Sequence, residues 1–205
     1  MDIEQKNEVI ESKTVVKLNP WTTIMFKPRA TMRYILNTNP PAGKVLLLIC
    51  LVIFTSLLTN EDQTISIDSF SIELFWHFIL ILAIGIPVIY YLVPLFFRWI
   101  GNILGGKGTT KEIRYVVGYT CIPSIYSFLL LMIFQIIESF FFEISTLPFE
   151  ILIMSISIWT FIVSLKCLAE AHKFSAWRAL GTMMIGWAII FVSVLLIILA
   201  IFLIR

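Results

Sequence analysis

The amino-acid sequence predicts an all-α, polytopic membrane protein with five transmembrane helices, preceded by a bent amphipathic helix at the membrane surface. The first supporting observation is composition: 59% of the residues are hydrophobic, 14% are charged, and the mean hydropathy is +0.95. A soluble globule of 205 residues cannot bury that much apolar surface, so lipid must cover it. The other two observations are five separate apolar runs and a one-sided distribution of basic residues.

Residues 1–18, MDIEQKNEVIESKTVVKL, form a polar segment of mixed charge. The segment has neither the apolar stretch nor the small-residue cleavage site of a secretory signal, so we expect it to be retained. It also has no periodic apolar face, which predicts a mobile cytoplasmic tail. Residues 19–205 are expected to form a single membrane domain.

Residues 19–38, which begin NPWTTIMFKPRATMRYIL, have the spacing of an amphipathic surface helix. Asn19 and Pro20 suit an N-cap and a first helical position, and Pro28 removes an internal hydrogen bond, so we expect two short helices that meet at an angle. The apolar stripe is expected to face acyl chains while its flanking cations approach anionic head groups. Simple anchoring at the membrane boundary is the alternative. The stripe consists of Trp21, Ile24, Met25, Pro28, Met32, Ile35 and Leu36, and the flanking cations are Lys27, Arg29 and Arg33.

Five apolar runs predict the spans, and each is expected to be a helix because lipid offers no partner for an open strand edge. The first run, VLLLICLVIFTSLLT, supplies only 15 residues. It therefore needs the preceding Pro41 to Gly43 or a locally thinner bilayer. The predicted spans are residues 43–60, 74–98, 115–141, 147–169 and 179–204.

The lysines and arginines predict the orientation of these spans. Seven lie before or at the start of the first span, none lies between the first and second, four lie at or after the end of the second, none follows the third, three lie near or after the end of the fourth, and only Arg205 follows the fifth. With five spans, fourteen of the fifteen cations fall on one side of the membrane, which is the bias of cytoplasmic segments. The N-terminus is thus predicted to be cytoplasmic and the C-terminus to lie outside.

The loop GNILGGKGTT, from Gly101 to Thr110, resembles a phosphate-binding P-loop in part. Gly108 stands where a P-loop needs Ser or Thr to hold magnesium, and a membrane span precedes the loop in place of a strand. We therefore interpret this loop as a flexible hinge that lets two helices approach each other.

Prolines within the second and third spans predict kinks, because each removes a backbone donor that lipid cannot replace. The functional hypothesis is a groove between these two spans that accepts a lipid or a partner helix. The alternative is ordinary packing of kinked helices. The residues assigned to kinks and packing are Pro87, Pro94, Gly118, Tyr119 and Pro123.

Three features taken together resemble a known family. They are NPW followed by KPRATMRYIL, the segment LGGKGTTKEIRYVVGYTCIP with its G-Y-x-x-x-P motif, and the five-span layout. The chain resembles the Yip (Ypt-interacting protein) domain family over about residues 19–204, and P-R-A-T-x-R, Pro28 to Arg33, resembles the entry motif of its bacterial branch. The long acidic region and the D-L-Y-G-P-type motif of eukaryotic members are missing. The resemblance implies a five-span membrane adaptor and does not extend to a Rab-type GTPase partner.

The sequence gives no positive indication of catalysis, a cofactor or a metal. It lacks H-E-x-x-H, G-x-S-x-G and S-x-x-K motifs, and its two histidines are predicted to lie on opposite sides of the membrane. Three cysteines without pairing or redox spacing are interpreted as structural thiols. Lys166 and Glu170 are one helical turn apart and are expected to pair. The layout of charge gives no indication of nucleic-acid binding.

We therefore expect a non-enzymatic membrane adaptor or accessory protein, with an ABC-type exporter as the first partner to test. A small transporter or lipid-moving protein that uses kinked spans 2 and 3 is the alternative. Other expected partners are anionic lipids of the inner face of the membrane. The sequence is also compatible with a homo-oligomer. The expected location is a bacterial cell membrane, or the ER or Golgi membrane in a eukaryote. The residues predicted to bind a partner or lipid are Trp21, Pro28, Arg29, Arg33, Arg98, Lys107, Lys111 and Arg114.

Overall fold

The fold is described from a computed structural model, which covers residues 18–58, 72–140 and 147–204. Within these ranges the chain is helical and contains no strand, which confirms the predicted all-α class. Apart from Leu18, the predicted mobile tail lies outside the described residues. The elements are α2 (Pro20–Phe26), α3 (Pro28–Thr38), α4 (Ala42–Leu58), α5 (Ile72–Pro87), the π-helical turn η2 (Val88–Leu92), α6 (Val93–Ile103), α7 (Thr110–Tyr119), α8 (Ile122–Phe140), α9 (Leu147–His172) and α10 (Ala176–Ile204).

Four helical stretches of the described chain are long and apolar enough to cross a membrane, which indicates a multi-pass membrane protein. A fifth apolar helix, Ala42–Ser56, is shorter, in agreement with the short first run of the sequence. The four long stretches are Ile79–Ile103, Thr110–Ile137, Leu147–His172 and Ala176–Leu203.

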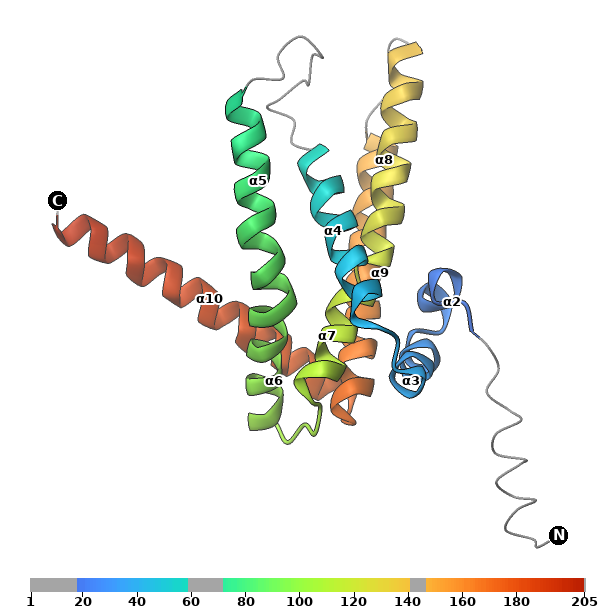
Figure 1. The fold of residues 1–205 in the computed structure, drawn as a ribbon, viewed down its shortest axis with the longest axis vertical. Coiled ribbons are helices and arrows are strands. Elements are labelled where there is room, and N and C mark those ends of the chain that lie inside the picture. Colours follow the sequence, from blue (N-terminus) through green and yellow to red (C-terminus); the bar gives the residue numbers. More distant parts are fainter. Residues whose placement is uncertain (1–17, 59–71, 141–146, 205) are drawn as a thin grey trace, which may run out of the picture.

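The helices form a bundle from which one helix departs (Figure 1). α4, α5, α8 and α9 run side by side, α2 and α3 lie across one flank, and α10 runs away from the bundle toward the C-terminus. The buried core lies where α3, α4, α7 and α9 meet, at one end of the bundle. Its fully buried side chains include Met32, Ile35, Val45, Ile49, Ile113, Val163 and Leu168.

The predicted pair of short N-terminal helices is present. The side chain of Asn19 caps α2 by accepting a hydrogen bond from the Trp21 amide over 3.2 Å, and Pro20 is the first helical residue. The helix ends at Phe26, Lys27 takes a non-helical conformation, and α3 starts again at Pro28. Local sequence chemistry therefore sets both the start and the break of this segment.

The prediction that the apolar stripe of this segment faces acyl chains is wrong. Ile24, Met32 and Ile35 are fully buried against the protein, so the stripe packs on α7, α8 and α9 and does not face acyl chains. The break at Lys27 also leaves the Met25 carbonyl without its helical partner, and Trp159 Nε1 of α9 donates to this carbonyl over 3.0 Å. An apolar stripe gains as much from protein as from lipid, and the bundle in addition offers this donor.

The prolines of the second and third predicted spans lie at interruptions of the helices. Pro87 ends α5, η2 follows, and Pro94 lies in the first turn of α6. In the next span α7 ends at Tyr119, α8 begins at Ile122, and Pro123 lies in the first turn of α8. The second predicted span thus consists of α5, η2 and α6, and the third of α7 and α8.

The glycine-rich loop is held in place, which corrects the prediction of a flexible hinge. The backbone carbonyl of His172 accepts a hydrogen bond from the Lys107 amide over 3.1 Å. The ring Nδ1 of His172 accepts one from the Gly108 amide over 3.3 Å. A Cβ added at Gly101, Gly106 or Gly108 would overlap the His172 ring. The absence of side chains at Gly101, Gly106 and Gly108 therefore leaves room for a buried imidazole between α6, the loop and the end of α9. Of the loop glycines, Gly105 alone has a positive φ, of 83°.

Candidate functional site

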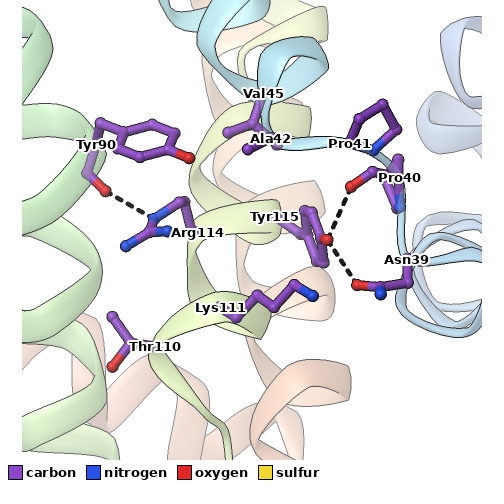
Figure 2. A pocket seen from close by; sticks show the side chains of 10 residues that line it. All are labelled: Asn39, Pro40, Pro41, Ala42, Val45, Tyr90, Thr110, Lys111, Arg114 and Tyr115. Carbon is purple, nitrogen blue, oxygen red and sulfur yellow. Dashed lines mark hydrogen bonds between the residues drawn. The ribbon is translucent and has the colours of Figure 1, made fainter.

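A cavity of about 510 Å³ lies between η2, α7 and the linker 39–41 that joins α3 to α4 (Figure 2). It is found between the second and third predicted spans, where the sequence suggested a groove. The side chains of Lys111 and Arg114 on α7 bring positive charge to it, and Tyr90, Tyr115 and other polar groups contribute hydrogen-bonding atoms. The ten lining residues are labelled in Figure 2.

The start of α7 is fixed by a capping box. Thr109 Oγ1 accepts a hydrogen bond from the Glu112 amide over 3.3 Å, and Glu112 Oε2 accepts one from the Thr109 amide over 2.7 Å. This cap sets where Lys111 and Arg114, three residues apart on one helix, enter the cavity. It also commits the Glu112 carboxylate to the backbone.

The guanidinium of Arg114 is fixed against η2. Its Nε donates a hydrogen bond to the Tyr90 carbonyl over 3.0 Å, and its Cζ lies 4.3 Å from the centroid of the Tyr90 ring. In an α-helical register that carbonyl would accept a hydrogen bond from the amide of residue 94, and Pro94 has no N–H to offer. Arg114 therefore supplies the partner that Pro94 removes, and its position over the ring adds a cation–π attraction.

The opposite wall of the cavity is held by Tyr115. Its hydroxyl lies 2.8 Å from Asn39 Oδ1 and 2.9 Å from the Pro40 carbonyl, and donates its hydrogen to these acceptors. Asn39 ends α3 in the left-handed conformation, with a φ of 50°, which Asn adopts more readily than most residues. The linker is thereby tied to α7 across a large distance in sequence.

A third cation joins the two on α7. Arg98 of α6 donates from Nη1 to Thr110 Oγ1 over 2.9 Å, and Thr110 lines the cavity. We name Arg98, Lys111 and Arg114 the basic cluster. Among the described residues that line the cavity none is acidic, so the cluster gives this region a net positive charge.

The other predicted binding residues are not brought to this cavity. Arg33 Nε forms an ion pair with Glu170 Oε1 of α9 at 2.7 Å, which raises the pKa of Arg33 through that hydrogen bond and the carboxylate charge. Arg29 is exposed on α3, and Lys107 belongs to the loop that contacts His172. The cations predicted to bind a partner or lipid therefore do not gather at one site: three form the basic cluster, and Arg33 belongs to a contact between α3 and α9.

Trp21 and Pro28 contribute backbone contacts inside the bundle. The Trp21 carbonyl accepts a hydrogen bond from the Tyr126 hydroxyl over 3.2 Å, and the Pro28 carbonyl faces Cys167 Sγ at 3.8 Å. Both contacts join the N-terminal helices to the spans. Pro28 is buried, whereas the Trp21 ring is 39% exposed.

The expected pair between Lys166 and Glu170 is replaced by other contacts. Glu170 binds Arg33, and Lys166 Nζ lies 5.8 Å from the centroid of the Trp159 ring. A guanidinium forms a more directional contact with a carboxylate than an ammonium does, and α3 brings Arg33 directly to Glu170. Sequence reasoning missed this pair because no local pattern relates α3 to α9.

The cavity contacts connect the segments that carried the family resemblance. The linker follows KPRATMRYIL, while Lys111, Arg114 and Tyr115 belong to LGGKGTTKEIRYVVGYTCIP. No curated protein and no solved structure matches the chain. A family model for the Yip1 domain matches residues 22–201. This match does not show that the chain belongs to a bacterial branch of the family. With most of its length matched and its helices long and apolar, the chain belongs to the Yip1 domain family of membrane proteins.

Proposed function

We propose that this protein is a non-enzymatic membrane adaptor that binds and organises another membrane protein through α10. The observation that carries the proposal is the exposure of the second half of this helix. Every residue from Phe191 to Leu203 is exposed around the whole circumference of α10. At 1.5 Å per residue, this arm is about 20 Å long.

The first half of α10 is packed, which distinguishes it from the arm. A Cβ added at Gly186 would lie 3.4 Å from a ring carbon of Phe96 and 3.5 Å from side-chain carbons of Phe97 and Ile100, all on α6. Beyond this contact α10 departs from the bundle (Figure 1). The arm has no polar stripe, so its complementary surface in a membrane is an apolar helix or acyl chains.

The topology that we propose has five spans, with α4 as the first. Its 17 residues extend about 26 Å, slightly less than the roughly 30 Å of a hydrocarbon core. The distribution of cations supports a cytoplasmic N-terminus and an outer C-terminus. The membrane that we propose is the cell membrane of a bacterium. Reporter fusions that locate both ends on one side would overturn this orientation.

An ABC-type exporter is the partner that we name first. The chain offers a helical body with an apolar arm, and its glycine loop lacks the Ser or Thr of a nucleotide-binding motif at Gly108. A partner that hydrolyses ATP would supply the energy that this chain has no motif to harness. The adaptor would then act as an accessory subunit.

The test is site-specific photo-crosslinking in native membranes. A photoreactive residue replaces Leu196 of the arm, and the matched control replaces Ile133 of α8, which is exposed to a similar degree. We expect a defined protein adduct at Leu196 and only lipid adducts at Ile133, with the same partner co-purifying in mild detergent. Lipid adducts alone at Leu196 would overturn the adaptor proposal, and adducts only with a second copy would overturn the exporter assignment.

A lipid-moving or transport role is the second candidate, favoured by the cavity beside the break at Pro87 and Pro94. Reconstitution of the purified protein in liposomes tests it. Saturable, unaided movement of labelled lipid or solute that is reduced by Lys111→Gln supports the transporter. Movement no faster than in empty liposomes overturns it.

A further inference from the structure

We infer that the cavity between η2, α7 and the linker 39–41 binds the phosphate group of an anionic phospholipid. This inference does not rest on the adaptor role, because it concerns the basic cluster and leaves the α10 arm aside.

The first step of the argument is uncompensated charge. The only ion pair among the described residues joins Arg33 to Glu170, outside the cavity. Glu112 is the acid closest in sequence to Lys111 and Arg114, and its Oε2 accepts from both the amide and the hydroxyl of Thr109. The basic cluster is therefore left without a carboxylate partner, which suits a bound anion.

The second step is preorganisation of Arg114. Its Nε and its ring contacts are used to hold the side chain against Tyr90. Among the described residues, no acceptor is bonded to its terminal nitrogens, so these donors stay available to a ligand. A guanidinium fixed in this way binds phosphate oxygens with little loss of side-chain entropy.

The third step is the arrangement of donors around the cavity. Figure 2 shows the guanidinium of Arg114 directed toward Tyr90 and the ammonium of Lys111 directed toward Tyr115 and Asn39. The two cationic groups thus point in opposite directions from α7, toward the two walls of the cavity. An exposed lysine has the length and freedom to turn toward an anion that Arg114 holds.

The fourth step distinguishes a lipid from a soluble phosphate. Exposed apolar residues lie on the same elements as the lining residues: Leu47 on α4, two positions after Val45, is 56% exposed, and Leu92 in η2, two positions after Tyr90, is 59% exposed. A cationic cavity between helices whose exposed side chains are apolar matches a phospholipid, whose phosphate and acyl chains need both. Its volume lies within the usual range for small-molecule sites.

The test measures lipid binding by the purified full-length protein with native mass spectrometry. The probes are phosphatidylglycerol, phosphatidylcholine, inorganic phosphate and glycerol 3-phosphate. The variants are Lys111→Gln and Arg98→Gln, both at exposed positions, and the control is Lys27→Gln, an exposed cation outside the cavity. Circular dichroism checks that each variant stays folded.

We expect the wild type to bind phosphatidylglycerol more tightly than phosphatidylcholine. Each variant of the basic cluster should weaken phosphatidylglycerol binding by about tenfold, while Lys27→Gln leaves it unchanged. Equal binding by the wild type and both folded variants of the basic cluster would overturn the inference. Binding of inorganic phosphate as tight as that of phosphatidylglycerol would overturn the assignment to a lipid. These outcomes use the protein alone, so they are independent of whether a partner crosslinks to α10.

Discussion

Arg114 Nε donates a hydrogen bond over 3.0 Å to the Tyr90 carbonyl, whose partner in an α-helical register would be Pro94, which has no N–H. A side chain that directly precedes the third predicted span thereby donates to the backbone of the second. This hydrogen bond fixes the angle between η2 and α7 and orients the guanidinium in the cavity. Arg114 thus both bonds the backbone of η2 and contributes a cation to the cavity.

Replacing Arg114 with methionine is expected to destabilise the protein, because the carbonyl of a largely buried tyrosine then lacks a donor. The loss should be about 1–3 kcal/mol in the free energy of unfolding. The measurement is unfolding in mixed detergent micelles, followed by tryptophan fluorescence. Arg114→Lys should lose less, since an ammonium is also a donor, although it lacks the planar contact with the ring.

The matched test of this cause is Pro94→Ala in the Arg114→Met background. Alanine returns an N–H to position 94, which can reach the Tyr90 carbonyl, so the double variant should regain stability that the single variant lost. Equal stability of the double and single variants would show that the hydrogen bond is not the source of the effect.

Gly101→Ala and Gly106→Ala are both expected to destabilise the loop end of the bundle, because the added methyl group overlaps the buried His172 ring. The loss is expected to be about 1–3 kcal/mol, as for other overpacked cores. Gly43→Ala is the control, since nothing lies within 4 Å of its added Cβ. Alanine there should be neutral or stabilise α4 by up to about 1 kcal/mol. Thermal unfolding in detergent distinguishes the two classes.

Features with a local cause were predictable from the sequence. Asn19 caps α2 because its side chain reaches an amide two residues on, and Pro28 interrupts the segment because it lacks an N–H. The spans follow in the same way from apolar length, since the bilayer sets a minimum number of residues. The α4 helix is short in both sequence and structure.

Features that depend on two distant segments were not predictable. Periodicity identified the apolar face that carries Met32 and Ile35, but it carries no information on whether lipid or protein covers that face. The contact between Arg33 and Glu170 joins residues 137 apart. His172 gave no signal on its own, and the glycines that surround it were interpreted as flexibility because the ring they accommodate comes from another helix.

Arg33→Gln should lower the thermal stability of the protein slightly at low salt, because it removes the ion pair with Glu170. The raised pKa of Arg33 means that the stabilisation is fully present below the unfolded pKa and is lost only as the pH rises through the folded pKa, at strongly alkaline pH. The effect is therefore expected to be constant around neutral pH. At about 1 M salt it should disappear through screening, whereas an effect that persists would indicate lost packing. Lys166→Gln is the control for α9.

Gly118→Ala should weaken the contact between α7 and α4, because Gly118 lies directly against Val45. An added Cβ would lie 2.6 Å from Val45 Cγ1 and 3.3 Å from its Cα, so the valine side chain and the backbone of α4 must both move. We expect a loss of about 1–3 kcal/mol in the free energy of unfolding. Val45→Ala in the same chain removes the overlapping methyl groups and should recover part of the loss. If the double variant loses as much as the sum of both single variants, the two residues are not coupled, and close approach of the helices is not the reason for glycine at this position.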